Sequence, residues 1–151
     1  MVRSNTLRNL ESALAGESMA HIKYRYFAKI AMEEGFEDVA KHFWKTADQE
    51  LLHAWGHLEL LIGRPSVEDC LKKAIDGETY EYTEMYPQME EIAEKEGDEQ
   101  AMLEARQQAK ESQDHAEHFK MVLEKAQKRF SALKKVEERH ANAYKKVLEA
   151  L

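Results

Sequence analysis

Residues 46–55 read TADQELLHAW and place Glu50 three positions before His53. Residues three apart lie on one face of a helix, so this carboxylate and this imidazole project to the same point. The spacing Glu-x-x-His returns at Glu137 and His140, near the end of the sequence. The sequence therefore predicts two helical segments that each offer one oxygen ligand and one nitrogen ligand to a metal ion.

Further glutamates lie among apolar neighbours at Glu17, Glu78 and Glu81. Buried carboxylates without partners are costly and tend to take up protons, whereas two divalent cations offset several converging negative charges. One Glu from each of two helices, with Glu-x-x-His from each of two others, is the ligand set of di-iron and di-manganese four-helix bundles. Oxygen and imidazole ligands without thiolates suit iron or manganese, and zinc less exclusively.

The composition favours long helices in a single domain spanning residues 1–151. The chain is 43% apolar and 34% charged, with only six glycines and two prolines. Such a chain is poor in turn-forming residues and rich in good helix formers, which indicates an all-α fold. The net charge of -7, without a basic cluster, argues against a nucleic-acid partner.

Cysteine usage and the amino terminus set the expected compartment. Cys70 is the only cysteine, so neither an internal disulfide nor a paired-cysteine metal site is possible. The first residues contain no long apolar stretch, so we expect neither a signal peptide nor a membrane span. The sequence is typical of a soluble cytoplasmic protein.

The first two predicted helices cover about residues 6–33 and 36–61. Apolar residues recur there at spacings of three and four, and Gly35 suits the residue after a helix end. Ser66 is expected to cap a short third helix, and we expect residues 76–77, Asp-Gly, to interrupt it before the helix that carries Glu78 and Glu81. Pro87 kinks that helix or lies where a lost hydrogen bond is tolerated.

The chain also contains internal repeats. Residues 15–18 resemble residues 76–79, sixty-one positions later, and His53 is repeated by His115, sixty-two positions later. Two helical hairpins related by a pseudo-twofold axis explain this pattern. In addition, residues 110–126 resemble residues 135–151, but Ser112 stands in the earlier copy where the later one has Glu137.

Four stretches of the sequence resemble the rubrerythrin family. They are AGESMAHIKYRYFA, TADQELLHAW, DGETYEYTEMYP and VEERHANAYKKVLEAL, at residues 15–28, 46–55, 76–87 and 136–151. These stretches are most similar to those of single-domain, symerythrin-like members without a rubredoxin domain. The resemblance implies a ferritin-like four-helix bundle with an extended or additional helical segment before the last ligand helix.

The resemblance also implies the ligands. They are carboxylates and imidazoles on four helices: Glu17, Glu50, His53, Glu78, Glu81, Glu137 and His140. Glu81 would bind in one oxidation state and swing away in another. Tyr24 and Tyr86 lie two turns from Glu17 and Glu78, so their hydroxyls are candidates to support the ligand carboxylates.

The implied protein is a non-haem di-iron oxidoreductase that reduces hydrogen peroxide in oxidative-stress defence. Its cofactor would be two iron ions, replaceable by manganese or zinc. With Cys70 alone, the electron donor must be a separate rubredoxin-like or ferredoxin-like protein, and a homodimer is expected. Reduction of dioxygen, ferroxidase activity, and metal storage without turnover are the alternatives at the same site.

The displaced position of Glu137 leaves three arrangements to consider. An unbroken helix would hold Glu137 on the same face as Ser112 but about 37 Å further along. In the first arrangement the hairpin is lengthened, with its turn near residues 107–112. In the second the chain bends near residues 127–131, which leaves residues 98–126 as an extra helix. In the third a long helix delivers Glu137 and His140 into a partner subunit. Chain direction favours the lengthened hairpin and this domain swap, since an added helix would reverse the ligand segment.

Overall fold

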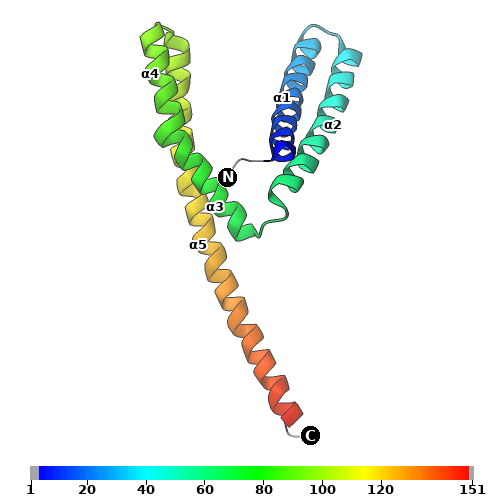
Figure 1. Cartoon of the computed structure of the whole chain (residues 1–151), viewed down its shortest axis with the longest axis vertical. Helices are drawn as coiled ribbons and strands as arrows, with labels where there is room; N and C mark the ends of the chain where they lie inside the picture. The colour runs from blue at the N-terminus through cyan, green and yellow to red at the C-terminus, as the bar shows by residue number, and fades with distance from the viewer. Residues whose placement is uncertain (1–3, 150–151) are drawn as a thin grey trace. The chain divides into compact units, whose positions relative to one another are not determined.

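The structure is a computed structural model that describes residues 4–149, and all its regular elements are helical (Figure 1). The elements are α1 (Asn5–Glu33), α2 (Glu37–Ile62), α3 (Val67–Tyr80), the π-helix η1 (Glu81–Met85), α4 (Tyr86–Glu96) and α5 (Glu99–Glu149). The predicted all-α fold is therefore confirmed. Within this described part, none of the helices is both long and apolar enough to cross a membrane.

The chain divides into two compact units, Met1–Pro65 and Ser66–Leu151. The predicted single domain over residues 1–151 stays a prediction, and each unit is described by itself. In the first unit α1 and α2 pack side by side as a helical hairpin. In the second, α3, η1 and α4 follow one another along the first half of α5 (Figure 1).

Both hairpins turn with the same backbone motif. Gly35 has a φ of 83° and donates its N–H to Met32, while the Phe36 N–H reaches the carbonyl of Ala31 at 2.8 Å. Gly97, sixty-two residues later, has a φ of 74° in the equivalent turn between α4 and α5. These are Schellman motifs, in which the left-handed residue is usually glycine because a side chain is disfavoured there.

Small residues fill the contact between the helices of each hairpin. The buried positions are Ala28, Ala31, Ala40, Ala47 and Ala54 in the first unit, and Ala93, Ala105, Ser112 and Ala116 in the second. Alanine at a helix contact lets two backbones approach closely. No side chain larger than alanine or serine is buried in the described part, so each hairpin leaves larger apolar groups such as Trp55 and Met89 exposed.

The structure resolves three local expectations for the second unit. The predicted interruption at residues 76–77 is wrong, because α3 runs through Gly77 without a break. Ser66 does cap this helix, since its side chain accepts the backbone N–H of Asp69 at 3.1 Å. Pro87 lies in the first turn of α4, directly after η1, where a missing N–H is tolerated.

Helix α5 is continuous over 51 residues. The predicted lengthened hairpin is wrong, because the turn lies at Gly97 rather than near residues 107–112. The predicted bend near residues 127–131 is also wrong, since nothing in that stretch ends a helix and α5 passes through it. Beyond Gln127, which donates to Glu68 of α3 at 3.2 Å, the helix continues with exposed side chains only.

Candidate metal centre

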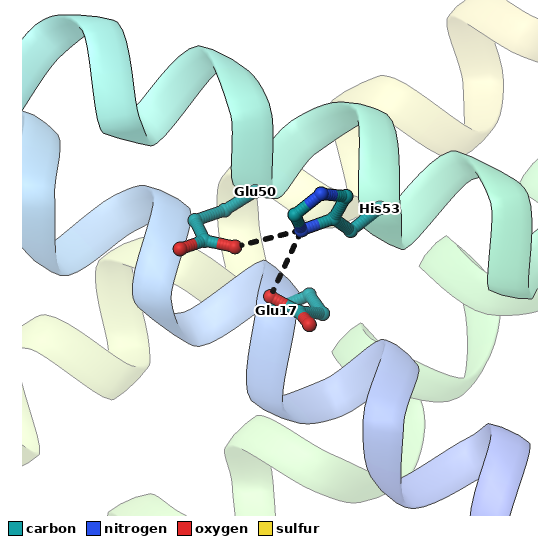
Figure 2. A group of neighbouring side chains, drawn as sticks. All are labelled: Glu17, Glu50 and His53. Carbon is teal, nitrogen blue, oxygen red and sulfur yellow. Dashed lines mark hydrogen bonds and ion pairs between the residues drawn. The ribbon is translucent and has the colours of Figure 1, made fainter.

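In the first unit, Glu17 from α1 meets Glu50 and His53 from α2 (Figure 2). His53 Nδ1 lies 3.1 Å from Glu50 Oε2 and 3.9 Å from Glu17 Oε2. One ligand atom from each of the three residues lies within 4.8 Å of the others. The predicted Glu-x-x-His face of α2 thus points at the glutamate of α1, and the group offers two carboxylates and one imidazole to a cation.

The two carboxyl groups of this cluster are coupled. A hydrogen bond with Glu50 is the main reason that the pKa of Glu17 is raised, with burial and the charge of Glu50 adding to it. The pKa of Glu50 is lowered, first by that hydrogen bond and then by one from His53. Opposite shifts of the two pKa values are expected when two carboxyl groups lie close together without a cation.

In the second unit, Glu78, Glu81, Ser112 and His115 form a comparable group. His115 Nδ1 lies 3.4 Å from Glu78 Oε2, and Ser112 Oγ donates to Glu81 Oε2 at 2.9 Å. Glu78 and Glu81 are half-buried, and Ser112 is only 4% exposed. The earlier copy of the repeated segment therefore faces the predicted acids of this unit.

The chemistry of both groups fits a metal ion with oxygen and nitrogen ligands. Within residues 4–149 no lysine or arginine forms an ion pair with Glu17, Glu50, Glu78 or Glu81, although many surface acids are paired in this way. Glu78 Oε2 is inaccessible to solvent and accepts no hydrogen bond from the described residues. A buried carboxylate oxygen without a donor is costly, and a cation would satisfy it. Hard carboxylate ligands with imidazole are the donors that suit iron and manganese.

The structure does not bring Glu137 and His140 to Glu78 and Glu81. Both lie on the exposed second half of α5, where His140 Nδ1 is 4.0 Å from Glu137 Oε2. His140 is twenty-five residues from His115 on one unbroken helix, or about 37 Å along its axis. Of the three arrangements, only delivery into a second copy remains, and that stays a prediction.

His115 is not among the ligands predicted from the sequence. Its segment lacks the glutamate that completes the Glu-x-x-His motif, so the later copy matched better. The available signal was its spacing of sixty-two residues from His53, which is also the spacing between Gly35 and Gly97.

The two predicted supporting tyrosines differ. Tyr24 packs against Phe43 with ring centroids 6.0 Å apart, so it belongs to an aromatic cluster between α1 and α2. The pKa of Tyr86 is raised, chiefly by burial and then by the negative charges of Glu81 and Glu78. Tyr86 therefore stays protonated beside the acids of the second unit, and its role as a support for them remains a prediction.

The sequence model of the rubrerythrin family matches residues 8–123. The chain belongs to the rubrerythrin family. The predicted ferritin-like fold class is confirmed by this family membership. The family match includes Ser112 and His115 and ends before Glu137 and His140.

The relatives found are longer than this chain. A putative rubrerythrin of Methanocaldococcus jannaschii is 35% identical over 144 residues, covering 81% of this chain and 71% of its own length. Nigerythrin of Nitratidesulfovibrio vulgaris is 38% identical over 112 residues, covering 65% and 55%. A solved structure of partially reduced nigerythrin is 31% identical with a TM-score of 0.43, covering 84% of this chain and 70% of that one.

Proposed function

We propose that this protein is a non-haem di-iron oxidoreductase that reduces hydrogen peroxide. The observation that carries the proposal is the convergence of Glu17, Glu50 and His53, which is repeated in kind by Glu78, Glu81 and His115. Each hairpin offers two carboxylates and one imidazole, the donors of a carboxylate-bridged pair of metal ions. Family membership supports the redox role, and the choice of peroxide as substrate is our inference.

In this proposal each hairpin offers its own ligand group to iron. Glu17, Glu50 and His53 would bind iron in the first hairpin, and Glu78, Glu81 and His115 would bind it in the second. Glu137 and His140 would take part only if a second copy supplies them. Manganese or zinc would fit the same donors, although zinc lacks the redox chemistry.

Two ferrous ions, when bound, supply the two electrons that convert one molecule of hydrogen peroxide and two protons into two molecules of water. The residues of the chain would hold the cations and neutralise their positive charge. The carboxylates would balance the charge of the cations, and a cation beside Glu17 would favour the ionised form of this carboxyl group, whose pKa the neighbouring Glu50 raises. Tyr86 keeps its hydroxyl proton, because burial and nearby acids raise its pKa.

The reductant is proposed to be a separate rubredoxin-like or ferredoxin-like protein. Cys70 is the only cysteine of the sequence, and a rubredoxin-type iron site needs four. The chain therefore lacks the ligands to hold such a site alone. Adding purified rubredoxin and its reductase to the iron-loaded protein should sustain consumption of peroxide.

We also propose a homodimer in which the second half of α5 contacts a second copy. Residues 124–149 expose large apolar side chains, among them Phe130, Leu133, Tyr144 and Leu148. They carry eight Lys and Arg but four Glu, a net charge of +4, and since the whole chain carries -7 the remainder carries -11. Opposite charges favour contact between this segment and another copy's remaining surface. Light scattering should show a dimer that chain termination after Lys128 abolishes.

Stopped-flow spectroscopy tests the peroxidase proposal. Protein loaded anaerobically with ferrous iron should be oxidised much faster by hydrogen peroxide than by air-saturated buffer. Equal rates would refute the peroxidase reading and favour ferroxidase or storage chemistry at the same site. Metal analysis showing clearly fewer than two irons per chain would refute the di-iron centre itself.

A further inference from the structure

The repeat between the two hairpins contains a one-residue shift. Glu17 and Glu78 are sixty-one residues apart, but Tyr24 and Tyr86 are sixty-two apart. The second hairpin has therefore gained one residue between Glu78 and Tyr86. The π-helix η1, Glu81–Met85, lies in this interval, and its Tyr86 N–H reaches back to the carbonyl of Glu81.

This π-helix accounts for the shift. A π-helical turn closes an i to i+5 hydrogen bond, so it holds one residue more than an α-helical turn. The additional residue is absorbed locally, and the positions after it regain the alignment with the first hairpin. Buried Ala31 and Ala93 correspond in this way, as do buried Ala54 and Ala116. The insertion thus affects one turn of the helix, and that turn begins at Glu81.

The ligands of the two hairpins differ at two positions. Ser112 corresponds to Glu50, so the second hairpin lacks this carboxylate, and Glu81 corresponds to Ala20, so the second hairpin has one extra. The structure joins the two differences, because Ser112 Oγ donates to Glu81 Oε2 at 2.9 Å. The Glu81 carboxylate therefore lies beside position 112, where the second hairpin lacks the counterpart of Glu50.

We propose that Glu81 supplies the carboxylate that position 112 lacks, and that Ser112 is the positioning residue that holds it there. This inference rests on the proposed di-iron function. A serine hydroxyl is neutral and short, hence a poor iron ligand, but it donates a hydrogen bond that fixes one carboxylate oxygen and leaves the other free. Ser112 is only 4% exposed, so a glutamate at this position would place a second negative charge beside Glu81 with little solvent to screen it.

The test removes the carboxylate at position 81 and introduces one at position 112. Metal-free protein is titrated anaerobically with ferrous iron, and with Co²⁺ as a spectroscopic probe, to obtain the affinity of each metal position. Glu81→Ala should weaken one position at least tenfold, because even groups that only orient a ligand contribute 10–100-fold. Adding Ser112→Glu to that variant should restore the affinity to within about threefold of the wild type.

Two further variants separate positioning from charge. Ser131→Glu, made in the Glu81→Ala background on the exposed part of the same helix, adds the same charge and should restore nothing. Ser112→Ala, with Glu81 intact, should weaken the same metal position several-fold, since it removes the hydrogen bond alone. Ser112→Asp is made in parallel with Ser112→Glu, as a shorter side chain for this nearly buried position.

The inference is overturned if Glu81→Ala leaves both affinities unchanged, or if neither acidic residue at 112 improves on Glu81→Ala while the helical circular dichroism is intact. Should neither acidic variant fold, Ser112→Ala decides, and an affinity within a factor of two of the wild type overturns the inference. A wild-type protein that binds no iron would instead refute the proposed function, so the two failures are distinguishable.

Discussion

Replacing His115 with alanine should damage metal binding, and replacing His140 in the same way should not. His115 Nδ1 lies 3.4 Å from Glu78, one of the acids of the second unit. His140 lies twenty-five residues further along α5, about 37 Å away, and its Nδ1 is 4.0 Å from Glu137 Oε2. Charges act over about 8 Å at physiological ionic strength, so no electrostatic effect of His140 extends to Glu78.

The expected magnitudes follow from these distances. Loss of a group that orients a ligand typically costs 10–100-fold in metal affinity, and an imidazole ligand should cost at least as much. We therefore expect His115→Ala to weaken one metal position by at least tenfold, or about 1.4 kcal/mol. His140→Ala should change both affinities by less than a factor of two.

Anaerobic titration with ferrous iron, followed by isothermal calorimetry and by the visible spectrum of a Co²⁺-substituted sample, measures both positions. The two variants are matched controls, since each removes an exposed histidine from the same helix. The opposite result, with loss of one metal in His140→Ala and none in His115→Ala, would refute the reasoning. It would show that a second copy delivers Glu137 and His140.

Three further results are expected. Gly97→Ala should lower the free energy of unfolding, measured in urea, by about 1–2 kcal/mol, because a side chain strains a residue at φ 74°. The control Gly56→Ala, inside a helix with open space around it, should raise the free energy of unfolding by up to about 1 kcal/mol. Equal effects of the two substitutions would contradict this prediction. Ser66→Ala should cost about 1 kcal/mol through loss of the cap on Asp69, and an unchanged urea midpoint would count against it. The pKa of Glu17 is raised, so its contribution to stability is present below pH 4.5 and is lost as the pH rises through the folded value. Glu17→Gln should therefore gain stability over metal-free wild type as the pH rises above 4.5; a difference independent of pH would exclude this coupling.

The sequence predicted the first hairpin and the meeting of Glu17, Glu50 and His53 within it. Glu50 and His53 share a helical face by spacing alone, and Gly35 fixes the turn that brings Glu17 opposite them. Hydrophobic periodicity and glycine positions are local signals, and they suffice to predict two helices that are joined by one short turn.

The second hairpin was predicted less well for a physical reason. A helical motif reports the face on which a side chain lies, but not its height along the axis. Twenty-five residues are close to seven turns, so Ser112 and Glu137 share a face and differ only in height. The turn at Gly97 sets that height, and it selects the copy with the weaker motif. The repeat spacing shows one inserted residue between Glu78 and Tyr86, but it does not show that a π-helix absorbs that residue.

The Schellman turns at Gly35 and Gly97 have a consequence for how the chain folds. Each joins helices that pack directly on one another, so the contacts within each hairpin are close in sequence. Chains dominated by local contacts fold quickly, in microseconds to milliseconds. We expect the two hairpins to form early and independently, before iron is bound. Glu17, Glu50 and His53 would then meet in a folding intermediate that has not yet bound metal.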